Sequence, residues 1–174
     1  KDPGIMEEFG LSADDNVITT ICRIDRGSSK TAFMLLDIAE SLDGEIDNLR
    51  IIIVGGGTLF DRLKDKAGAI NKKSGKELVT ITGPRSDISD ILSVTDVFTG
   101  ISRAALEAMA MGKTVISTRI GAGGLPAEHG EHLFLADTPA EYIRVLENLQ
   151  TRQDQLPKIG SRARQFVMEN FDIL

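Results

Sequence analysis

The sequence predicts an α/β fold, a Rossmann-like, doubly wound parallel sheet of about six strands with helices on both faces. Short apolar runs rich in β-branched residues alternate with longer stretches of helical periodicity along the chain. The runs are apolar on both sides, as expected for strands that helices cover on two faces. The length of 174 residues and the lack of an internal repeat favour one domain over residues 1–174.

The predicted strands are short and β-rich, which is typical of buried strands in a parallel sheet. They cover residues 17–22, 50–54, 78–81, 97–99, 114–118 and 132–135.

The predicted helices lie between these strands and after the last one. The start of the helix near Ala140 is the best marked, because Thr138 can cap it, Pro139 suits its first position and Glu141 can complete a capping box. We expect residues 1–14 to be a linker or an irregular N-terminal segment. The predicted helices cover residues 31–42, 58–69, 88–92, 102–111, 140–149 and 153–169.

Composition and charge exclude several classes of function. The formal net charge of −6 and a pI near 5.0 argue against a nucleic-acid partner. No apolar run approaches the roughly 20 residues that cross a bilayer, so we expect no transmembrane segment. The lone Cys22 excludes an internal disulfide and is expected to be a small core residue. A lysine cluster is interrupted by Asp65 and Glu77 and is expected to solvate a helix and a turn; its members are Lys64, Lys66, Lys72, Lys73 and Lys76.

The most informative stretch is 100–116, which places Glu107 inside an otherwise apolar helix of small residues. Gly100 and Ser102 provide a loop and an N-cap, so the first helical turn offers amides and the helix dipole to an anion. A carboxylate one turn further can accept hydrogen bonds from a ribose attached to that anion. Gly112 is expected to stop the helix. The pattern therefore predicts a nucleotide site.

Several segments in order resemble the C-terminal half of family-4 glycosyltransferases, which are GT-B enzymes that use nucleotide sugars. Residues 96–117 read as aspartate, apolar strand, glycine turn, Leu-Glu-Ala-Met-Ala and a Gly-Lys strand. Residues 17–23 look like the family's first strand with its arginine, and 51–57 like its second strand and turn. Residues 120–128 look like its glycine-rich loop before a glutamate. The resemblance covers residues 15–172, nearly all of the chain.

The resemblance implies that this chain is one half of a GT-B fold, the half that binds a nucleoside-diphosphate sugar. The acceptor would be held by an N-terminal domain absent from this chain, and the fragment alone would be inactive. It implies a hexosyltransferase of polysaccharide or glycoconjugate biosynthesis, retaining and metal-independent, with no cofactor. We expect a cytoplasmic protein, peripheral at the inner membrane face through the missing domain.

The candidate site residues follow the ends of the predicted strands, where ligands bind in open α/β sheets. By resemblance, Arg23 contacts the diphosphate, the amides of residues 101–103 cradle it, and Glu107 binds the ribose. The catalytic candidates are Arg23, Lys30 and Glu107. The donor-binding candidates are Gly55, Gly56, Arg85, Thr99, Gly100, Ile101, Ser102, Arg103 and Glu107. Two alternatives stay open: Arg23 in a surface salt bridge with Asp25, and Arg103 as a surface residue at the helix start.

Two positions depart from the family pattern. The family has a second glutamate eight residues before the equivalent of Glu107, and this chain has Thr99 there. The family also has a lysine five residues after the strand-one arginine, where this chain has Ser28. Lys30 or Arg26 could replace that lysine, and Lys30 is preferred because it begins the following helix. These changes make a non-catalytic nucleotide-binding or interaction domain the alternative function.

Other chemistries have weaker support. The turn at residues 55–57 suggests an NAD site, but Phe60 occupies the position of the third required glycine, so a tight turn is the preferred interpretation. His129 and His132 form no recognisable metal set, and no Asp-x-Asp occurs, so no metal site is expected. Glu128 could approach the sugar or serve as a surface or capping residue.

Overall fold

The computed structural model describes residues 1–171, apart from the side chain of Ser102. The chain divides into two units, Lys1–Thr95 and the part from Asp96 onward, which we call the N-terminal and C-terminal units. Each unit has three parallel strands with helices packed against them. No helix within residues 1–171 has the length and apolar character needed to span a membrane.

The strands of the N-terminal unit lie in the order β3-β2-β1 and run parallel. Ile18 is in register with Ile51, and Ile51 with Val79, so branched apolar side chains line up across all three strands. Such side chains are stiff and pack well on a pleated surface, which explains why these segments form strands. The strands are β1 (Asn16–Ile21), β2 (Leu49–Val54) and β3 (Val79–Gly83).

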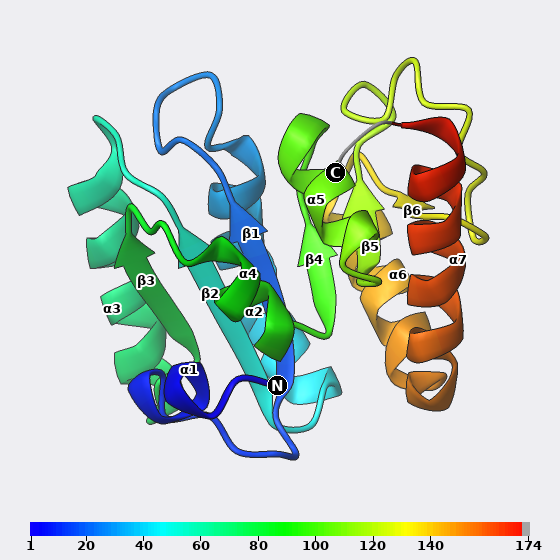
Figure 1. Cartoon of the computed structure of the whole chain (residues 1–174). Helices are drawn as coiled ribbons and strands as arrows, with labels where there is room; N and C mark the ends of the chain where they lie inside the picture. The colour runs from blue at the N-terminus through cyan, green and yellow to red at the C-terminus, as the bar shows by residue number, and fades with distance from the viewer. Residues whose placement is uncertain (172–174) are drawn as a thin grey trace. The chain divides into compact units, whose positions relative to one another are not determined.

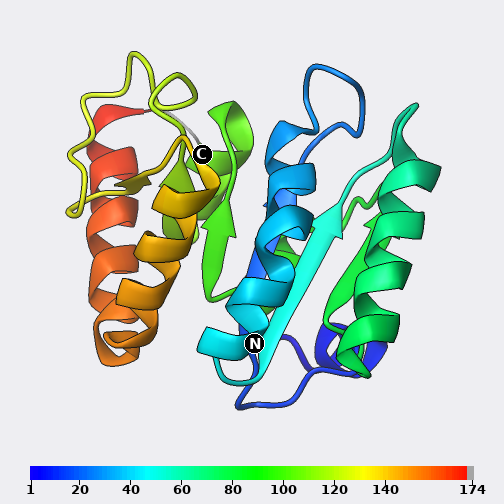
Figure 2. The same ribbon diagram turned by 180° about the vertical axis from the view of Figure 1, so that it is seen from behind.

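Four helices cover the two faces of this sheet. Figure 1 shows α1 and α4 on one face, and the reversed view in Figure 2 shows α2 and α3 on the other. The helices are α1 (Pro3–Glu8), α2 (Lys30–Glu45), α3 (Phe60–Ser74) and α4 (Ile88–Val94). The alternation of strand and helix predicted from the sequence is therefore present in this unit.

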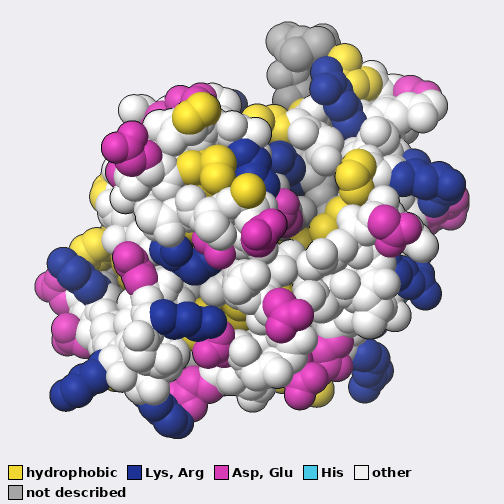
Figure 3. Space-filling model, turned by 90° about the horizontal axis from the view of Figure 1, so that it is seen from below, with side chains coloured by type: hydrophobic (Ala, Val, Ile, Leu, Met, Phe, Trp, Pro, Cys, Tyr) yellow, Lys and Arg dark blue, Asp and Glu magenta, His cyan; other side chains and the backbone are white. Residues whose placement is uncertain are grey.

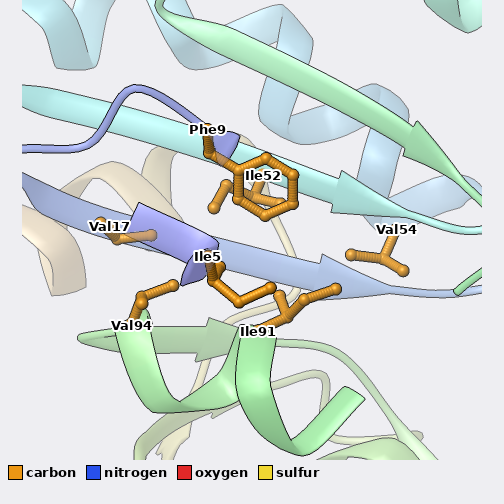
Figure 4. Packing of buried hydrophobic residues seen from close by; sticks show 7 residues of the cluster. All are labelled: Ile5, Phe9, Val17, Ile52, Val54, Ile91 and Val94. Carbon is orange, nitrogen blue, oxygen red and sulfur yellow. The ribbon is translucent and has the colours of Figure 1, made fainter. Parts of the chain in front are cut away.

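The first helix, α1, differs from the linker or irregular segment expected over residues 1–14. The Asp2 carboxylate caps it by accepting a hydrogen bond of 3.0 Å from the Ile5 amide. Ile5 and Phe9 are 5% and 6% exposed and join a buried cluster between the helices and the sheet, shown in Figure 4. A helix of one or two turns is not stable alone in water, so burial of these side chains, rather than local periodicity, decides its formation.

The lysine cluster of α3 faces the acidic side of α2. Lys66 pairs with Asp37, and Lys73 pairs with Glu40. Just after the end of α3, the Lys76 ammonium lies 2.6 Å from Asp43. Three of the lysines expected to be solvated thus form a row of ion pairs. On the face shown in Figure 3, basic and acidic side chains are interspersed.

The strands of the C-terminal unit lie in the order β4-β5-β6 and are also parallel. They are β4 (Val97–Thr99), β5 (Thr114–Ser117) and β6 (Phe134–Leu135). The helical elements are α5 (Ser102–Ala110), α6 (Pro139–Gln150), the 3-10 turn η1 (Gln153–Gln155) and α7 (Leu156–Asn170). Helices α5 and α7 pack against each other and against β5.

In this unit, the predicted start of one helix and the predicted end of another are confirmed. Thr138 and Glu141 form the predicted capping box at the start of α6. Helix α5 ends before Gly112, which has a φ of 71° and allows the chain to turn away. The predicted helix over 153–169 begins later than expected, because Pro157 fits only the first turn of α7.

Candidate functional site

The structure places the predicted site residues in two groups, one in each unit. Thr99, Gly100, Ile101, Ser102, Arg103 and Glu107 follow β4 in the C-terminal unit. Arg23, Lys30, Gly55, Gly56 and Arg85 follow β1, β2 and β3 in the N-terminal unit. Every candidate comes after a strand end or at the end itself, as the strand pattern predicts.

In the C-terminal unit, a short turn leads from β4 directly into α5. Thr99 is the last residue of β4 and is fully buried. The Gly100 amide donates a hydrogen bond of 3.0 Å to the carbonyl of Ile116, so the turn continues the pairing of β4 with β5. Ile101 is extended, with φ of −131° and ψ of 166°, and α5 begins at the next residue. The start of α5 is therefore fixed at the carboxyl edge of these strands.

The residue that caps α5 is Ile101, one position before the predicted cap, Ser102. Ser102 is instead the first helical residue, and its side chain lies outside the described part of the structure. Ile101 has no side-chain acceptor to offer the first-turn amides, and that turn contains no acidic residue. The positive end of the helix dipole is therefore not offset by an acid of the first turn, which favours an external anion.

Glu107 lies in the middle of α5, between the buried and the exposed side of the helix. Its side chain is 38% exposed and accepts a hydrogen bond of 2.8 Å from Nε of Arg103, one turn earlier. The Arg103 side chain is 91% exposed. Glu107 is therefore a partly shielded carboxylate in an ion pair, and both interpretations of Arg103 remain open.

The glycine-rich loop after β5 packs against the turn that starts α5. The Gly121 amide donates a hydrogen bond of 2.8 Å to the Thr118 hydroxyl. A Cβ atom at Gly121 would lie 2.2 Å from Cγ2 of Ile101, so a side chain at this position would separate the two loops. The preceding residue, Ile120, is 93% exposed. The sequence contains this glycine as a signal, but it does not reveal which segment the loop touches.

The two histidines hold the segment that leads to β6. Nδ1 of His132 accepts a hydrogen bond of 3.0 Å from the Glu128 amide. Nδ1 of His129 accepts one of 2.9 Å from the Leu135 amide. His132 also lies on the ring of Phe166, with centroids 4.6 Å apart. These contacts give both histidines a structural role.

In the N-terminal unit, Arg23 takes the arrangement that the sequence left as its alternative. Its guanidinium lies 2.9 Å from Asp25, and its side chain is 82% exposed. Asp25 also accepts hydrogen bonds from the amide and the hydroxyl of Thr58, at 2.8 and 3.1 Å. The Thr58 amide is the main cause that lowers the pKa of Asp25, followed by the Thr58 hydroxyl. Lys30 is the exposed first residue of α2.

The glycine turn after β2 lies against neighbouring backbone and ring atoms. Gly55 has a φ of 143°, and a Cβ atom there would lie 1.8 Å from the carbonyl oxygen of Cys22. A Cβ atom at Gly56 would lie 2.8 Å from Cγ of Pro84. Close approach between loops therefore explains these glycines, in agreement with the tight-turn interpretation. Cys22, expected to be a core residue, is only partly buried, and this burial raises the pKa of its thiol to about 11.

Arg85 has a structural arrangement that the sequence does not reveal. Its guanidinium donates to Asp87, with Nε at 2.8 Å, and also pairs with Glu8 at the end of α1, with Nη2 at 2.9 Å. It also lies 5.7 Å from the ring centre of Phe9. Hydrogen bonds to Asp87 and Glu8 raise the pKa of Arg85 further above its ordinary value. These contacts hold α1 to the turn before α4, and the donor-binding role of Arg85 stays a prediction.

The family described as glycosyl transferases group 1 matches residues 15–152 of this chain. No curated protein sequence matches.

Solved structures with the same fold are numerous. HepE of Anabaena, crystallised with UDP and glucose, has a TM-score of 0.82 and 22% identity, covering 97% of this chain and 47% of HepE. The C-terminal domain of a glycosyl transferase group 1 family protein (LpcC) from Francisella tularensis has a TM-score of 0.81 and 16% identity. The match covers 100% of this chain and 94% of that domain. A sucrose-phosphate synthase from Thermosynechococcus elongatus has a TM-score of 0.78 and 19% identity. The match covers 95% of this chain and 44% of the synthase.

These likenesses confirm the predicted fold class, a parallel Rossmann-like sheet that forms one half of a GT-B fold. This chain spans about half the length of HepE, the first of these proteins. Its match to a C-terminal domain over nearly the full length of both chains agrees with the half that the sequence indicated.

Proposed function

Because this chain belongs to the glycosyl transferases group 1 family, we propose that it is the donor-binding part of a glycosyltransferase. The proposed substrate is a nucleoside-diphosphate sugar. HepE, whose fold it shares, has been crystallised with UDP, a nucleoside diphosphate, and with UDP-glucose, a nucleoside-diphosphate sugar. The acceptor would be held by an N-terminal domain outside this chain.

The observation that carries the proposal is that α5 begins at a cap residue without a side-chain acceptor and carries a half-shielded carboxylate further along. The first-turn amides attract a diphosphate, because the cap residue Ile101 offers them no side-chain acceptor. Glu107 follows the first helical residue by five positions, a rise of about 7.5 Å along the axis. A ribose attached to the diphosphate would reach toward that carboxylate. Glu107 would bind its hydroxyls by charge-assisted hydrogen bonds.

The proposed chemistry is sugar transfer with retention of configuration and without a metal ion. As the bond to the anomeric carbon breaks, negative charge grows on the departing diphosphate. Amide dipoles at the start of α5 and fixed cations would stabilise that charge. The roles that the family resemblance implies for Arg23 and Lys30, as cations toward the diphosphate, belong to this proposal. Transfer by this chain alone is not expected.

A non-catalytic nucleotide-binding domain is the second candidate, and Thr99 is the observation that favours it. Thr99 stands where the family has a glutamate that contacts the donor sugar, and its side chain is fully buried. Its hydroxyl has no hydrogen-bond partner among the described residues. The sugar would therefore lose one contact at this position, while the contacts proposed for the diphosphate and ribose would remain.

Calorimetric titration of the 174-residue chain with UDP, GDP, ADP and UDP-glucose tests the proposal. We expect Glu107→Gln to weaken binding of the preferred nucleoside diphosphate by about tenfold, because it replaces a charge-assisted hydrogen bond with a neutral one. Glu169→Gln is the matched control, since Glu169 is an exposed glutamate on α7 with an (i, i+4) partner, Gln165. The control should bind as the wild type does.

Two results would contradict the proposal: wild-type protein that binds none of the four compounds, or Glu107→Gln that binds as well as Glu169→Gln. Donor hydrolysis or transfer after restoring the N-terminal half then separates an enzyme from a binding domain. Turnover supports the transferase, whereas tight binding without turnover supports the second candidate.

A further inference from the structure

We propose that Arg103 exchanges partners when the donor binds. Its guanidinium moves from Glu107 to the diphosphate, and the Glu107 carboxylate becomes free to bind the ribose. This inference rests on the proposed function of the same site and gives Arg103 a specific part in it. Arg103 would be a binding residue for the phosphates and, through its release of Glu107, a control on ribose binding.

The contact that must change is the ion pair along α5. Arg103 is the second residue of the helix and Glu107 the sixth, so their side chains meet one turn apart. Nε of Arg103 lies 2.8 Å from Oε1 of Glu107. The carboxylate that the proposed function assigns to the ribose therefore already has a cationic partner. A ligand that needs the charge of this carboxylate must share it or displace Arg103.

The existing ion pair is easy to displace. The Arg103 side chain is 91% exposed, so solvent screens the pair strongly. The order of the two residues is also the weaker one, since an acid before a base along a helix suits the dipole better than the reverse. The guanidinium extends from the first turn, where the backbone amides carry partial positive charge.

A diphosphate at the start of α5 would reverse this balance. It would place negative charge beside both the first-turn amides and the guanidinium, which otherwise repel each other. Phosphate oxygens also match the planar guanidinium and allow two parallel hydrogen bonds. Arg103 needs no unfolding for this exchange, because its side chain is exposed and only its rotamers change. The geometry thus favours Glu107 in the free protein and the diphosphate in the complex.

The exchange predicts that Arg103 discriminates between ligands with and without phosphates. We compare UDP with uridine by titrating each into the 174-residue chain. The titrations are followed by NMR, because nucleosides bind weakly. Arg103→Gln should weaken UDP binding by about tenfold or more, since it removes a charge-assisted contact. Uridine binding should stay within about twofold of the wild type or become tighter, since Glu107 loses only an exposed ion pair. Arg164→Gln, at an exposed arginine of α7, controls for the change in net charge.

A second measurement follows the guanidinium itself. The Nε–H signal of Arg103, assigned by its loss in Arg103→Gln, should shift strongly with UDP and only slightly with uridine. In Glu107→Gln the signal of the free protein should already differ from the wild type, because its partner is altered. This readout is independent of affinity and would not respond to UDP if Arg103 were only a surface residue.

Three outcomes would overturn the inference. Equal losses of UDP and uridine binding in Arg103→Gln would mean that Arg103 only positions Glu107. No loss of either would mean that the pair is a surface contact without a role in binding. A wild-type chain that binds none of UDP, GDP, ADP and their nucleosides would overturn the proposed function as well. The first two outcomes, in contrast, overturn only the role of Arg103.

Discussion

A glycine in α7 offers the sharpest test of the packing in the C-terminal unit. In a helix interior, Gly→Ala normally stabilises by about 1 kcal/mol, because alanine loses less conformational entropy on folding. At Gly160, however, the added Cβ atom would lie 1.9 Å from the carbonyl oxygen of Gly112 and 2.7 Å from its carbon. Both contacts are with backbone, so α7 must move away from the end of α5. Overpacking of this kind costs about 3 kcal/mol, which leaves Gly160→Ala less stable by about 2 kcal/mol.

The matched control is Gly68→Ala in α3, where no atom outside the helix lies within 4 Å of the added Cβ. It should be more stable than the wild type by about 1 kcal/mol. Thermal unfolding followed by circular dichroism should show Tm lowered by about 4–8 °C for Gly160→Ala and raised by about 2–4 °C for Gly68→Ala. A Gly160→Ala protein as stable as the wild type would refute the close contact between α7 and the turn after α5.

Two further predictions concern the charges and caps that hold helices in place. Arg85→Gln should destabilise the protein at neutral pH, because hydrogen bonds from Arg85 are the main cause that lowers the pKa of both Glu8 and Asp87. Lowered carboxyl pKa values stabilise the fold above the unfolded values and lose that effect as the pH falls, so the difference from the wild type should shrink below about pH 4. Urea midpoints of both proteins from about pH 7 down to about pH 3 test this, and a difference independent of pH would contradict it. Thr138→Ala should cost about 1 kcal/mol by removing the acceptor for the Glu141 amide, whereas Thr138→Ser should recover most of that in thermal unfolding. Equal stability of the alanine and serine variants would count against the cap.

Two elements with clear local signals, an apolar run and a marked helix start, were predicted closely. The strand over 97–99 has the predicted bounds, and α6 begins one residue before its prediction, at the Pro139 that follows Thr138. The misses have a common cause. Helix α1 is too short to show a period, and β6, Phe134–Leu135, is half the length of its predicted strand. Both depend on distant packing partners, which a local pattern does not contain.

In the candidate site, too, local features were predictable from the sequence and contacts between distant segments were not. The acid within an apolar helix and the glycine turn before it identified α5, because backbone geometry and helix polarity depend on neighbouring residues. The contact of Gly121 with Ile101 and the clamp of Arg85 on Glu8 were not predictable, since each joins segments far apart in the sequence. The choice of partner for such groups depends on which loops meet in space.

The amino-acid order alone therefore determined the alternation of strands and helices, the cap of α6 and the resemblance to a sugar transferase family. These properties follow from hydrophobic periodicity, turn chemistry and short motifs, which act over a few residues. Folding in three dimensions decided that α1 exists and that Arg85 pairs with Glu8 at the end of that helix. Such outcomes depend on burial and on competition between charged partners, and these are settled only when the whole chain has packed.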